Sequence, residues 1–126
     1  MSSLKTYFTV LCMALLVPAH ARAGDDPPVR FFAECAGRMS ASVEHAWLTG
    51  ADDAPLRAQR DGFADIIAAL TEPASRVQVM DWRIRAKMDH KRLLSVAVFS
   101  DKPRLARLAT IQARAHVSRC GAVLLG

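Results

Sequence analysis

The stretch ECAGRMSASVEHAWL, residues 34–48, decides the fold of this chain. It predicts an amphipathic helix, because its apolar and small side chains recur at a spacing of three or four residues. On a helical wheel with about 100° per residue, one face gathers around Cys35 and the opposite face carries charge. The Cys35 face holds Phe31, Phe32, Met39, Ser42, Val43 and Ala46, and the opposite face holds Glu34, Arg38, Ala41 and Glu44.

Gly37 does not fit a simple solvent-facing position in this helix. It lies about 200° from Cys35, on the same side as Ala41 and Glu44. An exposed glycine inside a helix costs about 1 kcal/mol relative to alanine. Either the chain tolerates this cost, or a second backbone approaches Gly37 closely and leaves no room for a side chain.

Residues 1–23 have the form of a secretory signal peptide. The polar start MSSLK is followed by the apolar run TYFTVLCMALLV, by Pro18 and by the small-residue site Ala21-Arg22-Ala23. The run is too short to be a membrane-spanning helix. We expect cleavage after Ala23, with cleavage after Ala21 as the weaker alternative. The mature chain, residues 24–126, is then a single domain, and its alanine-rich, arginine-rich composition favours the bacterial periplasm.

The cysteines predict a crosslink. Cys12 leaves with the signal peptide, so the mature chain keeps Cys35 and Cys120. An even pair in an exported chain indicates a disulfide, which closes a long loop and contributes roughly 4 kcal/mol in the chain-entropy model. Two free thiols or an interchain bridge are the alternatives. The sequence contains no C-x-x-C motif, so a redox-active cysteine pair is not expected.

The mature chain is predicted to be all-α, because no stretch combines a strict alternation of apolar and polar residues with β-branched residues and hairpin turns. Gly50 is placed to end the first helix, Asp53 to cap the second, and Pro73 to separate the second from the third. Short connections favour an antiparallel, up-down four-helix bundle whose first and last helices are joined by Cys35–Cys120. The expected helices cover residues 29–48, 53–71, 74–99 and 103–120.

The third of these helices carries two apolar stripes. One contains Val79, Trp82 and Ala86. We expect the helix to bend or break near Asp89-His90, where lysines interrupt the pattern. The alternative is a helix covered on two sides, which would indicate a homodimer. The other stripe contains Val77, Met80, Ile84 and Met88.

Charge is divided between the two halves of the mature chain. Residues 24–75 hold four Lys/Arg and nine Asp/Glu, whereas residues 76–119 hold eleven Lys/Arg and three Asp. Export argues against nucleic acid as the partner of the basic half. The densest run, WRIRAKMDHKR at residues 82–92, is either a solvated helix face or a surface for a partner protein or an anionic surface. Its candidate binding residues are Trp82, Arg83, Arg85, Lys87, Lys91 and Arg92.

No pattern in the chain supplies catalytic machinery. The sequence has no G-x-S-x-G, H-E-x-x-H, P-loop or dinucleotide-binding motif. His45 and His90 lack a second ligand at helical spacing, so neither a metal site nor another cofactor site is expected from them. We therefore expect no enzyme. The sequence favours a non-catalytic binding or interaction module, such as an adaptor, an inhibitor or a stress-related accessory protein.

Two resemblances accompany this interpretation. If Cys35 faces Cys120 on antiparallel helices, Met39 faces His116, and that pair in a small periplasmic bundle resembles the haem ligation of cytochrome b562. The resemblance implies an alternative function, a haem-binding electron carrier that uses Met39 and His116. The elements C-A-G-R-M-S-A and E-H-x-W-L are similar to small uncharacterised exported proteins of alphaproteobacteria, a resemblance that implies no activity.

Overall fold

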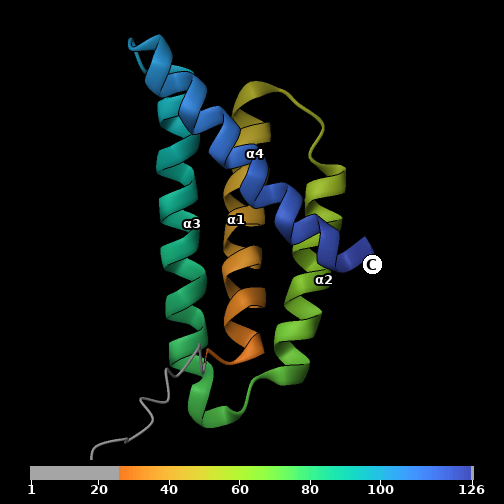
Figure 1. Ribbon diagram of the computed structural model, residues 1–126. Coiled ribbons are helices and arrows are strands. Elements are labelled where there is room, and N and C mark those ends of the chain that lie inside the picture. Colours follow the sequence, from red (N-terminus) through yellow and green to blue (C-terminus); the bar gives the residue numbers. More distant parts are fainter. Residues whose placement is uncertain (1–25, 126) are drawn as a thin grey trace, which may run out of the picture.

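The computed structural model describes residues 26–125, which form four α-helices and one short 3₁₀ turn. The helices alternate in direction and pack as a bundle, so the all-α, antiparallel architecture is confirmed (Figure 1). No strand occurs in residues 26–125. The predicted signal peptide lies outside these described residues. The elements are α1 (Pro28–Thr49), α2 (Ala54–Leu70), η1 (Pro73–Ser75), α3 (Arg76–Phe99) and α4 (Pro103–Leu125).

The bundle is built around α1 rather than around a shared central axis. Figure 1 shows α1 between α3 and α2, with α4 crossing this layer obliquely. Ten residues of α1 are buried, whereas one is buried in α2, three in α3 and four in α4. The first helix therefore supplies most of the core, and the other three helices each cover part of it.

The end of α1 follows the sequence prediction. Gly50 has the left-handed conformation, with φ 69°, and its backbone N–H donates to the Ala46 carbonyl. A residue with a side chain would be strained in this conformation, so a glycine after the last turn is the expected choice.

The start of α2 corrects one detail of that prediction. Asp53 occupies the cap position but makes no side-chain capping bond. The Ala54 backbone N–H instead donates to Asp52 Oδ1 at 3.0 Å. The Asp53 carboxylate accepts from Trp47 Nε1 at 2.6 Å and pairs with Arg57 at 2.9 Å. Asp53 therefore links the end of α1 to the start of α2.

The break expected in α3 is wrong. The helix runs without interruption from Arg76 to Phe99, through Asp89 and His90. Its buried residues, Val79, Ala86 and His90, follow one another at seven and then four positions and so lie on one face. Because His90 continues the buried face instead of ending it, the packing against α1 stays in register and the helix has no reason to stop.

Gly37 marks the closest approach between α1 and α3. A Cβ built on Gly37 would collide with the carbonyl oxygen of Arg83 and would lie 2.9 Å from the backbone nitrogen of Lys87. Ala41, one turn further along the same side, is also buried. The face of α1 expected to point outward is therefore interior, and the second explanation for Gly37 holds: a backbone approaches it, and that backbone is α3 of the same chain.

The predicted disulfide pins α4 to the other side of α1. Cys35 and Cys120 are bonded, with their Cα atoms 5.6 Å apart. Both cysteines are fully buried in a core cluster with Ala36, Met39 and Phe63. The crosslink therefore lies inside the apolar core. It joins α1 to α4 through two cysteines that are 85 positions apart in the sequence.

The close approach at Gly37 predicts a large effect for a small substitution. Gly37→Ala should lower the free energy of unfolding by about 1–3 kcal/mol, because the added methyl group meets backbone that cannot rotate away. Gly62→Ala in α2 is the matched control, since its Cβ would only touch Leu124 at 3.8 Å. That variant should gain about 0.5–1 kcal/mol from helix propensity. Urea unfolding of both variants measures the difference, and equal stability would contradict the packing described here.

Loss of the crosslink should weaken the fold strongly. We expect the double variant Cys35→Ala/Cys120→Ala to lose up to about 4 kcal/mol of unfolding free energy, because the unfolded chain regains the entropy of an open loop. Denaturant unfolding measures this loss. Non-reducing mass spectrometry of the mature wild type supplies the covalent test, and a free thiol at Cys35 would contradict the bond.

Candidate functional site

The basic segment of α3 is largely paired with carboxylates. Lys87 forms an ion pair with Glu44 of α1, and Lys91 approaches the same carboxylate at 3.6 Å. The Lys87 hydrogen bond lowers the pKa of Glu44, with smaller contributions from the charge of both lysines, so this acid is held ionised. Arg85 and Arg92 pair with aspartates of α3 itself. Four of the six residues predicted to bind a partner therefore lie within ion-pair distance of a carboxylate of the same chain, although Lys87 and Lys91 share the one carboxylate of Glu44.

Trp82 and Arg83 serve the packing between α1 and α3. Trp82 packs against the core cluster of Val29, Ala33 and Val79, and the Arg30 guanidinium lies 5.6 Å from its ring centroid. The Arg83 carbonyl is the group that contacts Gly37. Neither residue is the exposed centre of a cationic patch.

The two residues considered as haem ligands do not form a haem site. Met39 is fully buried among the residues around the disulfide, and His116 lies beside His90, with 5.9 Å between the ring centroids. One turn away, the Cα atoms of Cys35 and Cys120 are only 5.6 Å apart, which is closer than ordinary helix axes. A porphyrin cannot enter between helices held this tightly, so the residues present do not fit the group.

The candidate binding site is a groove to which all four helices contribute. It has a volume of about 400 Å³, and its walls are mainly apolar. Figure 1 shows α4 crossing α1 obliquely, and residues of α4 form one wall of the groove. Its lining residues are Ser42, His45, Ala46 and Thr49 of α1, Ala51 and Asp52 of the following loop, Leu56 of α2, His90 and Leu94 of α3, and Ala113, Arg114, Val117 and Ser118 of α4.

His90 is the most deeply placed polar residue of the groove. Its side chain belongs to a residue that is only 2% exposed, and Nε2 lies 3.1 Å from Ser42 Oγ. Its other ring nitrogen, Nδ1, is buried without a hydrogen-bond partner, as is Nδ1 of the neighbouring His116. A buried polar atom without a partner costs roughly 1–3 kcal/mol, so this arrangement needs a functional or structural reason.

The surroundings of His90 keep its ring neutral. Burial is the largest of the causes that lower the pKa of His90 to about 4, and repulsion from His116, Arg38 and His45 makes smaller contributions. Burial also lowers the pKa of His116, with contributions from Arg38 and Arg119. Both rings are therefore uncharged near neutral pH.

The Ser42–His90 contact contains the atoms of a nucleophile and a base, but it lacks the setting of a catalytic pair. A serine nucleophile needs a base with a pKa near the working pH and a third group that orients the base. His90 is a much weaker base than this, and no carboxylate acts on it. The contact is suited to holding the His90 ring in place rather than to activating Ser42.

In the sequence, His90 appeared only as a lone histidine without a second metal ligand at helical spacing, and the groove was therefore not predicted. The signal that could have found it is present in the other helices. Ser42 lies on the Cys35 face of α1, and His116 lies on the Cys120 face of α4. Two polar residues on inward faces require buried partners, and His90 is the polar residue of α3 that supplies one.

Two further features of the described residues concern metal binding and membrane insertion. Within residues 26–125, no three His, Cys, Asp or Glu side chains come together as a metal site would require. No helix in this part of the chain is both long and apolar enough to span a bilayer.

Comparison with known proteins finds no matching family model, no matching curated sequence and no matching solved structure. The chemistry of the groove and of the molecular surface therefore provides the indications of function.

The lowered pKa of His90 predicts acid sensitivity. The folded state resists protonation until about pH 4, whereas the unfolded ring binds a proton below about pH 6.5. Stability is therefore complete above about pH 6.5 and falls by roughly 3 kcal/mol as the pH drops toward 4. His90→Gln should remove most of this slope, as measured by urea unfolding across the pH range. His116→Gln should remove a smaller part, because His116 is less buried. An unchanged slope in His90→Gln would contradict the assignment.

Proposed function

We propose that the mature chain is a non-catalytic binding module of the periplasm. Its ligand is a small, largely apolar molecule that carries one anionic group, and it binds in the groove above His90. The observation that carries the proposal is the groove itself, which has a volume of about 400 Å³, mainly apolar walls and a cation, Arg114, among its lining residues. An apolar body can be buried against these walls while an anionic group pairs with the Arg114 guanidinium.

The walls of the groove favour an apolar ligand body. Ala46, Leu56, Leu94, Ala113 and Val117 present methyl and aliphatic side chains around the cavity. A volume of about 400 Å³ falls within the range in which proteins hold small molecules. Burying an apolar ligand against such walls provides the main part of the affinity, and the few polar groups set its orientation.

The charge around the groove favours an anionic group on the ligand. Arg114 lies in the lining of the groove, and its side chain carries a permanent positive charge. Asp52 is the single carboxylate among the lining residues, and its Oδ1 already accepts from the backbone of α2. Ser42 and His90 hold each other in place at the groove, with Nε2 3.1 Å from Oγ.

The other roles suggested by the sequence have less support. For an adaptor or inhibitor that uses the basic segment of α3, the support is weaker, because four of its cations already lie beside carboxylates of the same chain. The close approach of α1 and α4 at the disulfide counts against a haem carrier. Among these functions, we therefore prefer the binding of a ligand in the groove.

The test uses decanoic acid as the probe and decan-1-ol as its neutral counterpart. We expect decanoic acid to bind the refolded mature protein and to shift NMR signals of residues that line the groove. Decan-1-ol should bind more weakly because it lacks the charge. Arg114→Leu should weaken decanoic acid binding about five- to tenfold, the equivalent of one charge-assisted contact of about 1–1.4 kcal/mol.

Two further variants separate the groove from the general surface. Ser118→Trp places a large side chain at an exposed lining position and should block binding. Ala115→Trp makes a comparable change at an exposed position of α4 that does not line the groove, so binding should be retained. Equal affinity in these two variants, or no binding of decanoic acid by the wild type, would overturn the proposal.

A further inference from the structure

The outer face of α3 presents apolar side chains that nothing in the described chain covers. Val79, Ala86 and His90 face α1, and a second set of apolar residues points away from it. These exposed residues define the α3 outer face. Their exposed fractions range from 50% to 84%, and they are Val77, Met80, Ile84, Met88, Val98 and Phe99.

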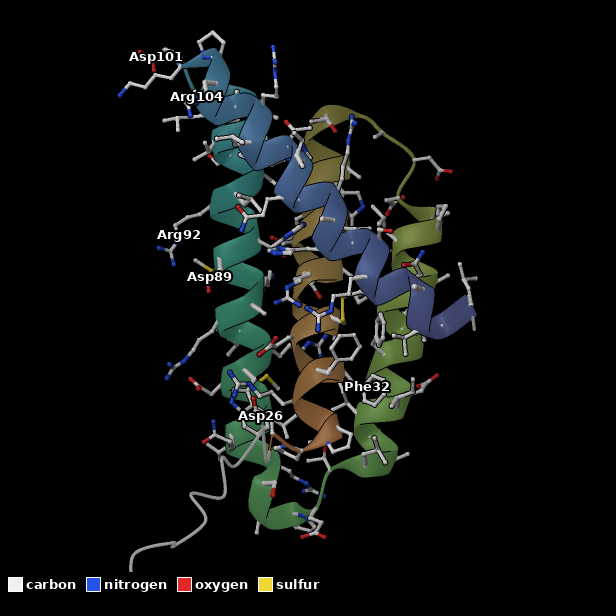
Figure 2. All side chains as sticks on the ribbon, in the orientation of Figure 1. Asp26, Phe32, Asp89, Arg92, Asp101 and Arg104 are labelled. Carbon is white, nitrogen blue, oxygen red and sulfur yellow. A yellow bond between two sulfur atoms is a disulfide. The ribbon has the colours of Figure 1, made fainter. Side chains whose placement is uncertain are left out.

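A row of alternating charges runs beside this apolar face. In chain order it reads Asp81, Arg85, Asp89, Arg92, spaced four, four and three residues apart, so its members lie along one flank of the helix. Figure 2 shows Asp89 and Arg92 projecting from α3 away from the bundle. Within the chain, Arg85 pairs with Asp81 at 2.9 Å and Arg92 pairs with Asp89 at 2.7 Å.

When this row is read in the opposite direction, an arginine stands at each place where the forward order has an aspartate, and the reverse. The row can therefore pair with a second copy of itself that runs antiparallel. In an antiparallel pair of α3 helices, Asp81 of one copy lies opposite Arg92 of the other, and Arg85 lies opposite Asp89. In a parallel pair about a two-fold axis, the row would meet the opposite flank of the second copy instead of the row itself, so this complementarity would be lost. A two-fold axis repeats each such contact twice, as in most protein homodimers.

We propose that the protein forms a homodimer in which the α3 outer faces of two copies pack antiparallel, about a two-fold axis at the level of Lys87. The apolar residues of each copy cover those of the other, and each aspartate of the row gains a second guanidinium without losing its own. A shallow hollow of about 270 Å³, lined by Asp89, Arg92, Leu93 and Val96, lies beside the row.

The size of the face predicts a reversible dimer rather than an obligate one. A helix of 24 residues is about 36 Å long, and one pair of such helices buries an area at the lower end of specific interfaces. The opposite flank carries Lys87 and Lys91, which share Glu44. Its remaining positive charge is exposed to solvent and screened by salt, so it weakens the contact without preventing it.

The first test compares two isoleucines with similar exposure. Ile84 on α3 is 52% exposed and Ile111 on α4 is 58% exposed. Analytical ultracentrifugation from micromolar to millimolar protein should show a concentration-dependent dimer for the wild type and for Ile111→Glu. Ile84→Glu should be a monomer throughout that range. Both positions are at the surface, and circular dichroism verifies that each variant keeps its helices.

The second test examines the antiparallel pairing itself. The double variant Asp81→Lys/Asp89→Lys makes the row wholly cationic, and Arg85→Glu/Arg92→Glu makes it wholly anionic. Each variant alone should be a monomer, whereas an equimolar mixture should restore a dimer that contains one copy of each. High salt should reduce the association of the mixture.

Several outcomes would overturn the proposal. If the wild type stays monomeric at millimolar concentration, a second copy does not cover this face and the proposal is wrong. If such a monomer binds vesicles that contain anionic lipid, and Ile84→Glu abolishes the binding, the occupant is a membrane surface instead. A dimer that survives Ile84→Glu uses another interface, and charge-reversed variants that remain monomeric when mixed exclude the antiparallel pairing.

Discussion

The structure depends on the contact between Gly37 of α1 and the backbone of α3 at Arg83 and Lys87. Helices normally stay 8–10 Å apart because their side chains lie between them. At Gly37 the missing side chain lets one backbone rest against another, and Ala41, one turn further along the same side, is buried as well. The side of α1 that appears polar by periodicity thus becomes interior, and α1 is covered on both sides.

A central helix solves a problem of size. A domain of about a hundred residues has little apolar surface to bury, and here α1 receives α3 on one side and α2 and the disulfide on the other. The consequence is that the three outer helices bury only part of their apolar surface. Val77, Ile84 and Phe99 of α3 and Ile111 of α4 remain exposed for this reason.

The two surfaces considered for function arise from this arrangement in different ways. The groove forms where α4 leaves the layer obliquely, so that Ala113 and Val117 form a wall above Ser42 and His90. The α3 outer face remains uncovered because α1 occupies the opposite face of the same helix. Only His90 and Leu94 of α3 line the groove, and neither belongs to the outer face, so a dimer through α3 leaves the groove open in both copies.

The sequence by itself determined the helices, their order and the pairing of Cys35 with Cys120. These follow from local signals, such as the left-handed Gly50 and the prolines at helix starts, and from simple counting of cysteines. Tertiary structure decided which faces meet. Periodicity separates polar from apolar sides of a helix. It cannot show that Gly37, opposite Cys35, contacts α3, that Ala41 on the same side is buried, or that His90 contacts Ser42. Those contacts join residues almost fifty positions apart, and they depend on how closely two backbones approach, which no local pattern encodes.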